Sequence, residues 1–191
     1  IAEGARVTLV SRTLETLQSA QRELQSATPS ATVNIIPADL RNAAEAERMV
    51  EAVERDFGAV DVLVNSAGAA KRTPAAELTT DAWHDAMQAK FFTYIHVINP
   101  LIKKMGARGR GAVVNVVGAG GKVAAVTHLA GGSANAALML ASSGLAAAYA
   151  GKAPGSRVDF PMPWVAPRAQ GRFAGKVYLL VNRHSYSNTV S

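Results

Sequence analysis

Short apolar runs alternate along the chain with longer segments whose apolar residues recur every three or four positions. The short runs are rich in β-branched residues and predict buried strands, and the longer spacing predicts amphipathic helices. The expected strands are 5–10, 33–37, 60–64 and 112–117, and the expected helices are 13–27, 42–57, 81–104 and 133–149, with a kink at Pro100. This alternation indicates a parallel sheet with helices on both faces.

The loops at the carboxyl ends of parallel strands are where such sheets bind ligands. Ser11 and Arg12 follow the first strand, Asp39 and Leu40 follow the second, and the third ends in Asn65-Ser66-Ala67-Gly68. A hydroxyl followed by a guanidinium would bind a ribose 2′-phosphate by donating hydrogen bonds to it, or would simply be a surface pair at the start of a helix. Asp39 would accept from an adenine amino group or cap the helix beginning near residue 42.

The third of these loops is rich in small residues. Ala67 and Gly68 would let the backbone approach a flat ligand closely, and Asn65 could tie adjacent strands together. We therefore expect a nucleotide-type ligand along the ends of the first three strands.

Residues 1 to about 158 resemble the short-chain dehydrogenase/reductase family. The resemblance is carried by EGARVTLVSR, the Asp39-Leu40 pair, DVLVNSAG at 61–68, the helix that contains Trp83, GAVVNVV at 111–117 and the helix at 133–149. It implies a Rossmann-type doubly wound sheet and NAD(P)-dependent hydride transfer between an alcohol and a carbonyl on a small-molecule substrate. Ser11, Arg12, Asp39, Leu40, Asn65, Ala67 and Gly68 would then contact the cofactor, with NADP(H) favoured over NAD(H). The resemblance also implies a homo-oligomer formed through helices 81–104 and 133–149.

The chain departs from the family at every catalytic position. The family's asparagine, serine, tyrosine and lysine correspond here to Lys90, Gly118, Gly131 and Asn135. The family's glycine-rich phosphate turn precedes the point where this sequence begins, so weaker cofactor binding is expected. Because glycine carries no proton, tyrosine acid/base chemistry is unavailable, and the protein is either an atypical oxidoreductase or inactive.

Three residues are candidates for replacing that chemistry. Lys90 would donate a proton if burial lowered its pKa, and would otherwise be an ordinary ion-paired lysine. His128, three positions before Gly131, would act as acid or base, or is an ordinary loop histidine. Asn135 stands where the family's lysine holds the nicotinamide ribose, and Ser133 is expected to cap its helix.

Composition narrows the possible partners. The 191 residues carry a net charge of +6, but the basic residues fall in short separate clusters, which favours a solvated face over nucleic-acid binding. No apolar run approaches the roughly 18 residues of a membrane span. The absence of cysteine excludes disulfides, zinc fingers and cysteine nucleophiles, and no metal site is expected. A cytoplasmic location is the expectation.

The C-terminal part of the chain breaks the pattern. We divide it into a linker at 159–175 and a tail at 176–191, after a domain spanning 1–158 that ends in a short strand at 157–160. Residues 173–191 resemble the nucleophile segment of the C-terminal-processing serine peptidases, with Ser187 at the nucleophile's place but without the partner lysine. Alternatively, the apolar segment 176–181 fills a vacant central position between strands 5–10 and 60–64. Two rival functions follow: a non-catalytic Rossmann-like binding module, or a truncated fusion with a peptidase-derived tail.

Overall fold

The computed structural model describes residue 1 and residues 4–149, which alternate between strands and helices as predicted. The strands are β1 (Val7–Ser11), β2 (Val33–Pro37), β3 (Val62–Asn65) and β4 (Ala112–Asn115). The helices are α1 (Leu14–Ala27), α2 (Ala43–Phe57), α3 (Thr80–Ala86), α4 (Thr93–Ala107) and α5 (Leu129–Tyr149), joined by the 3-10 turns η1 (Ala75–Glu77) and η3 (Ala119–Gly121) and the π-helix η2 (Met87–Phe92).

The strands form two parallel pairs. β1 pairs with β2, with Val7 opposite Val33, and β3 pairs with β4, with Asn65 opposite Asn115. Within the described residues no strand joins β1 to β3, so the pairs are separate two-stranded sheets. The predicted strands at 157–160 and 176–181 lie outside the described residues, together with the linker and the peptidase-like tail. Occupation of the position between β1 and β3 by 176–181 therefore stays a prediction.

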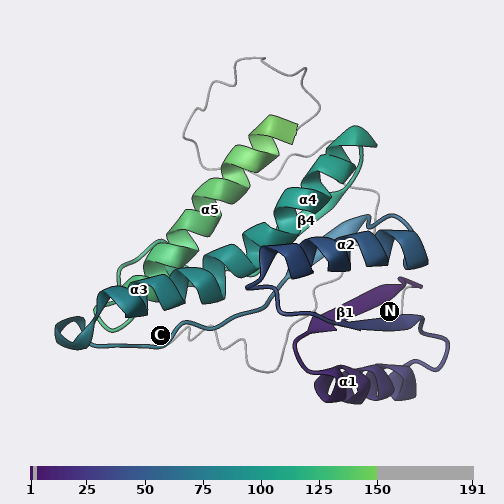
Figure 1. Ribbon diagram of the computed structural model, residues 1–191, viewed down its shortest axis with the longest axis horizontal. Helices are drawn as coiled ribbons and strands as arrows, with labels where there is room; N and C mark the ends of the chain where they lie inside the picture. Colours follow the sequence, from purple (N-terminus) through teal and green to yellow (C-terminus); the bar gives the residue numbers. More distant parts are fainter. Residues whose placement is uncertain (2–3, 150–191) are drawn as a thin grey trace, which may run out of the picture.

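One of the two hydrophobic core clusters of the described residues holds the two sheets together. Figure 1 shows β1 between α1 on one side and α2 on the other. On its buried face, α2 shares a hydrophobic core with α4 and β4. The core combines Val10 and Ile36 from one sheet, Leu63 and Val113 from the other, and buried residues of α2 and α4: Met49, Val50, Val53, Val97, Leu101 and Met105. Each fully buried side chain of this kind stabilises the fold by about 1.5–3 kcal/mol. Because α2 and α4 pack such side chains against strands of both sheets, they hold the carboxyl ends of the two sheets in one assembly.

The predicted helix 81–104 is interrupted, but not at Pro100, where a kink was expected. Its irregular turn is the π-helix η2, whereas Pro100 lies inside α4, which continues to Ala107. The wider turn leaves carbonyls without their usual donors, and the Thr93 hydroxyl donates to the carbonyls of Gln88 (2.9 Å) and Ala89 (2.7 Å). π-Helical turns are frequent at functional sites, and this one carries Lys90.

Two predicted helix caps are wrong. α5 begins at Leu129, so Ser133 lies inside the helix and is exposed. The cap of α2 is Asn42, whose side chain accepts from the Glu45 amide at 3.2 Å, and not Asp39. In both cases the side chain that was expected to cap lies too far from the first free N–H groups of the helix.

Candidate active site

The predicted site residues lie at the carboxyl ends of the four strands, in two groups. The first, which we call the β2-loop cluster, comprises the predicted Ser11, Arg12, Asp39 and Leu40, together with Arg41, which was not predicted. The second, the α5 cluster, gathers Lys90, Gly118, His128, Gly131 and Asn135 around the N-terminal end of α5. The Asn65–Gly68 loop after β3 packs against η2 of the α5 cluster.

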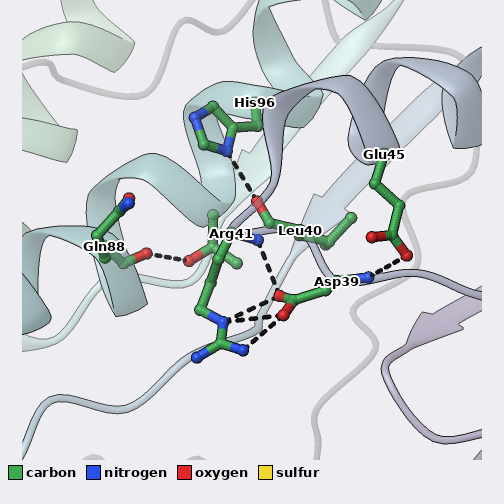
Figure 2. Close-up of polar contacts among 7 residues, drawn as sticks. Asp39, Leu40, Arg41, Glu45, Gln88 and His96 are labelled. Carbon is green, nitrogen blue, oxygen red and sulfur yellow. Dashed lines mark hydrogen bonds and ion pairs between the residues drawn. The ribbon is translucent and has the colours of Figure 1, made fainter.

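Asp39 is the centre of the β2-loop cluster. Hydrogen bonding to Arg41, whose Nε and Nη2 donate at 3.0 Å and 2.5 Å, and to a smaller extent the nearby charge of Arg12 lower the pKa of Asp39 to about 2. The backbone of Ala38 donates to the Ser11 carbonyl at 2.9 Å, which keeps this loop beside the end of β1. Figure 2 shows the Arg41 guanidinium closing over both carboxylate oxygens. The sequence analysis missed Arg41, which occupies the carboxylate expected to meet adenine.

Contacts with the neighbouring helices hold this loop rigid. The Asp39 amide donates to the Glu45 carboxylate at 2.9 Å, and the Leu40 carbonyl accepts from His96 Nδ1 at 2.9 Å. Because a carbonyl only accepts, the proton of His96 is on Nδ1. The loop is thus fixed by α2 on one side and α4 on the other.

Asn65 ties the strand ends together, as predicted. Its Nδ2 donates to Asn115 Oδ1 at 2.9 Å, and Asn115 Nδ2 donates to Ser142 Oγ at 2.8 Å. Asn65 is buried, so this chain of hydrogen bonds joins β3, β4 and α5 in the interior. Asn115 and Ser142 escaped the sequence analysis because strand pairing, which brings residues 65 and 115 together, was needed to find them.

Gly68 places the β3 loop directly against the π-helix. Its φ is +77°, and a Cβ there would lie 2.9 Å from the carbonyl carbon of Ala89 and still closer to its oxygen. Only glycine permits this approach. The adjoining Lys90 is half-buried, its pKa is lowered by burial, and no described carboxylate pairs with it. Ala67 packs on the core beside Tyr94.

His128 fills the space that a side chain on residue 131 would require. A Cβ on Gly131 would lie 2.6 Å from His128 Nε2 and 2.8 Å from the Cβ of Ala70. The imidazole is half-buried, and its Nδ1 is buried without a hydrogen-bond partner. Burial lowers the pKa of His128, and the positive charges of Arg72 and Lys90 lower it further. A neutral imidazole thus lies against Gly131, the residue that the sequence predicts at the position of the family's tyrosine.

Asn135 occupies a second vacated position. A Cβ on Gly118 would lie 2.9 Å from Asn135 Nδ2, so the amide fills the space beside Gly118, the residue that the sequence predicts at the position of the family's serine. Asn135 is only 2% exposed, and its Oδ1 is buried without a partner. An unsatisfied buried carbonyl oxygen costs about 1–3 kcal/mol, so a ligand hydroxyl or amide that donates to Oδ1 would be favoured there.

No described tyrosine replaces the missing acid. The Tyr94 hydroxyl is buried, donates to the Val116 carbonyl at 3.0 Å, and has its pKa raised to about 12 by burial. The ring of Tyr149 lies against Gly106, at the opposite end of α5 from His128. Over the described ranges there is no group of three metal-ligating side chains and no helix long and apolar enough to cross a membrane.

Comparisons with known proteins fit this geometry. A family model described as short chain dehydrogenase matches residues 1–155. A Streptomyces coelicolor protein assigned as a ketoacyl reductase is 36% identical over 135 residues, which are 70% of this chain and 51% of that protein. The chain spans about half the length of the curated relatives it matches.

Solved structures show the same fold. A short chain oxidoreductase from Pseudomonas aeruginosa PAO1, bound to NADPH and containing an atypical catalytic center, has a TM-score of 0.72 at 28% identity, over 76% of this chain and 57% of that one. A variant of actinorhodin polyketide ketoreductase with NADPH has a TM-score of 0.73 at 30% identity, over 78% and 57% of the two chains. These neighbours confirm the predicted Rossmann-type α/β arrangement.

Proposed function

The chain belongs to the short-chain dehydrogenase family, and we propose that it is an atypical NADP(H)-dependent oxidoreductase that transfers hydride between an alcohol and a carbonyl on a small molecule. The observation that carries the proposal is the placement of His128, whose imidazole fills the space above Gly131. A titratable ring at this position can exchange the proton that accompanies hydride transfer.

The described residues fit a nicotinamide cofactor at both of its ends. In this proposal Arg12 and Ser11, which lie beside the Asp39–Arg41 pair, would bind an adenosine 2′-phosphate. At the other end, the unpaired Oδ1 of Asn135 can accept a hydrogen bond from a ribose hydroxyl. When bound, the cofactor supplies the hydride donor or acceptor.

His128 performs the proton transfer in this proposal. At neutral pH its lowered pKa leaves the ring unprotonated, so it accepts the alcohol proton as the carbinol C–H hydride leaves and the carbonyl forms. In the reverse direction, imidazolium donates that proton to the carbonyl oxygen as hydride arrives at carbon. Lys90 stabilises negative charge on this oxygen, and its lowered pKa makes it a second candidate proton donor. Asn135 orients the cofactor.

NADP(H) is favoured over NAD(H) by the charge of the β2-loop cluster. The carboxylate of Asp39 is already paired with Arg41, and that of Glu45 accepts from the Asp39 amide, so the guanidinium of Arg12 is left to meet a phosphate. A second negative charge on the ribose would therefore be attracted rather than repelled. Two structural neighbours were solved with NADPH, which supports this preference.

A non-catalytic nucleotide-binding module is the second candidate. It is favoured by the replacement of all four family catalytic positions, at Lys90, Gly118, Gly131 and Asn135. In that case His128 and Asn135 would only fill space. The truncated fusion with a peptidase-derived tail, including Ser187, concerns residues outside the described ranges and stays a prediction, as does the cytoplasmic location.

Transfer of deuterium from 4-deuterated NADPH to a carbonyl product separates the two candidates. An oxidoreductase forms deuterated alcohol, and His128→Gln lowers the rate of its formation about 100-fold, which is the usual contribution of a positioned acid or base. A binding module binds NADPH without forming product. The His84→Gln variant is the matched control, because His84 is exposed on α3.

A further inference from the structure

We propose that the substrate of this site is an oxo acid or hydroxy acid, whose carboxylate is bound by Arg72 and Lys90 beside His128. This inference rests on the proposed function and specifies its substrate class. It begins from an imbalance of charge around the α5 cluster.

The two charged side chains whose fields lower the pKa of His128 are both cationic. Arg72 comes from the loop before η1 and Lys90 from η2, while neither the first turn of α5 nor η3 contributes a charged residue. None of the described carboxylates pairs with Arg72 or Lys90. A half-buried ammonium without a counter-ion is unfavourable, so the site is prepared for an anion that the described residues do not supply.

The loop that carries Arg72 is fixed beside His128. The backbone N–H of Thr73 donates to the Thr127 carbonyl at 3.0 Å, which joins the residues next to Arg72 and to His128. The Cβ of Ala70 lies 2.8 Å from the position of a Cβ on Gly131, so the same loop also contacts the start of α5. Arg72 is therefore held at the rim of the site, where its exposed guanidinium can bind a carboxylate in a bidentate manner.

The shared use of Lys90 limits where the carboxylate sits on the substrate. An ammonium has three donors, and one can reach the reacting oxygen while another reaches a carboxylate only if the two groups are close together. This favours 2-oxo and 3-oxo acids, or their hydroxy counterparts, over acids with a distant carboxylate.

Binding of the substrate carboxylate would also raise the pKa of His128, the proton donor of this site. The cations that lower the pKa of His128 would be neutralised by the bound carboxylate, so the imidazole would hold its proton more tightly in the complex than in the free protein. The substrate would thereby help to protonate the residue that donates to its carbonyl.

The test uses a redox-inert pair of probes of equal size, butanoate and butanamide, and needs no cofactor. Ring resonances of the four histidines are followed by NMR against pH, and His128→Gln identifies the signal of His128. We expect butanoate to bind at least about tenfold more tightly than butanamide and to raise the pKa of His128 by about half a unit or more. Arg72→Gln and Lys90→Met should each weaken butanoate about tenfold. Lys71→Gln, which removes the same charge from the neighbouring position, should not.

Equal binding of the two probes overturns the inference, and so does a Lys71→Gln variant that weakens butanoate as much as Arg72→Gln does. Turnover is measured separately with 3-oxobutanoate and its methyl ester in the presence of NADPH. If neither compound is turned over, the proposed function is contradicted but the inference is not, because butanoate binding is measured without turnover. A KM for the ester as low as that for the acid contradicts the inference alone.

Discussion

The imidazole Nε2 of His128 lies 2.6 Å from the point where a Cβ on Gly131 would sit, so the histidine ring and a side chain at 131 exclude each other. The histidine ring is the end of a side chain and can swing away, whereas the Cβ of Ala70, 2.8 Å from the same point, moves only with its backbone. At Gly132, by contrast, a Cβ would lie 2.7 Å from the backbone oxygen of Gly120, which cannot move without shifting η3.

Adjacent glycines should therefore respond differently to alanine. Gly131→Ala should displace His128 and lower turnover about tenfold or more, and should also lower stability, because the loop at Ala70 must shift and helix propensity offsets only part of that strain. Gly132→Ala should lower the free energy of unfolding by about 1–3 kcal/mol. Urea denaturation and initial rates of NADPH oxidation measure both effects. A Gly131→Ala variant with unchanged rates would show that the position of His128 does not matter.

The Asn65–Asn115 hydrogen bond should contribute to stability. Asn65→Ala leaves Asn115 Oδ1 without its donor in the interior and should cost about 1–3 kcal/mol, measured as a fall in the urea midpoint. The Asn65→Ala/Asn115→Ala double variant completes a thermodynamic cycle. Additive losses in that cycle would mean that the two amides do not interact.

The sequence patterns predicted the four described strands and the α-helical regions to within a few residues, because the alternation of β-branched runs and helical spacing is strong in this chain, but they did not predict the 3-10 turns η1 and η3 or the division of 81–104 into α3, η2 and α4. They failed at η2, since a π-turn depends on how Gly68 packs against Ala89 and leaves no periodic signal. Lys90, His128 and Asn135 were found through their positions relative to family motifs. Arg41 and Arg72 were not found in this way. Arg41 acts through an exposed contact with Asp39, and the loop of Arg72 reaches His128 only through a contact between residues that are distant in sequence.

Cofactor preference should depend on Arg12. Removing its guanidinium by Arg12→Gln deletes a charge-assisted contact with a 2′-phosphate and should weaken NADPH binding about 10- to 100-fold, with little effect on NADH. Fluorescence titration with the two cofactors measures this. Arg22→Gln serves as the control, since Arg22 is exposed on α1. Equal losses for NADPH and NADH would contradict a 2′-phosphate site at Arg12.

Self-association should use the groove between α4 and α5. It is lined by Ile95, Ile98, Asn99, Ala141, Gly144 and Leu145, and the strongly exposed Leu140 lies one helical turn from Gly144. A Cβ on Gly144 meets nothing within 4 Å, so Gly144→Arg should leave the fold intact and convert a dimer into a monomer in sedimentation. Ala146→Arg, an exposed position on another face of α5, should not. Identical sedimentation of Gly144→Arg and the parent chain would exclude this groove.

The most direct test of the account is the pH dependence of alcohol oxidation with NADP+ in the parent chain and in His128→Gln. Because burial and the charges of Arg72 and Lys90 lower the pKa of His128, the base form predominates above an inflection that lies below 6.5. We predict that kcat/KM rises through that inflection as pH increases, that carbonyl reduction falls through it, and that both inflections vanish in His128→Gln with a rate loss of about 100-fold. A His128→Gln variant that keeps the parent's rate and pH profile would contradict the assignment of His128 as the acid and base of this site.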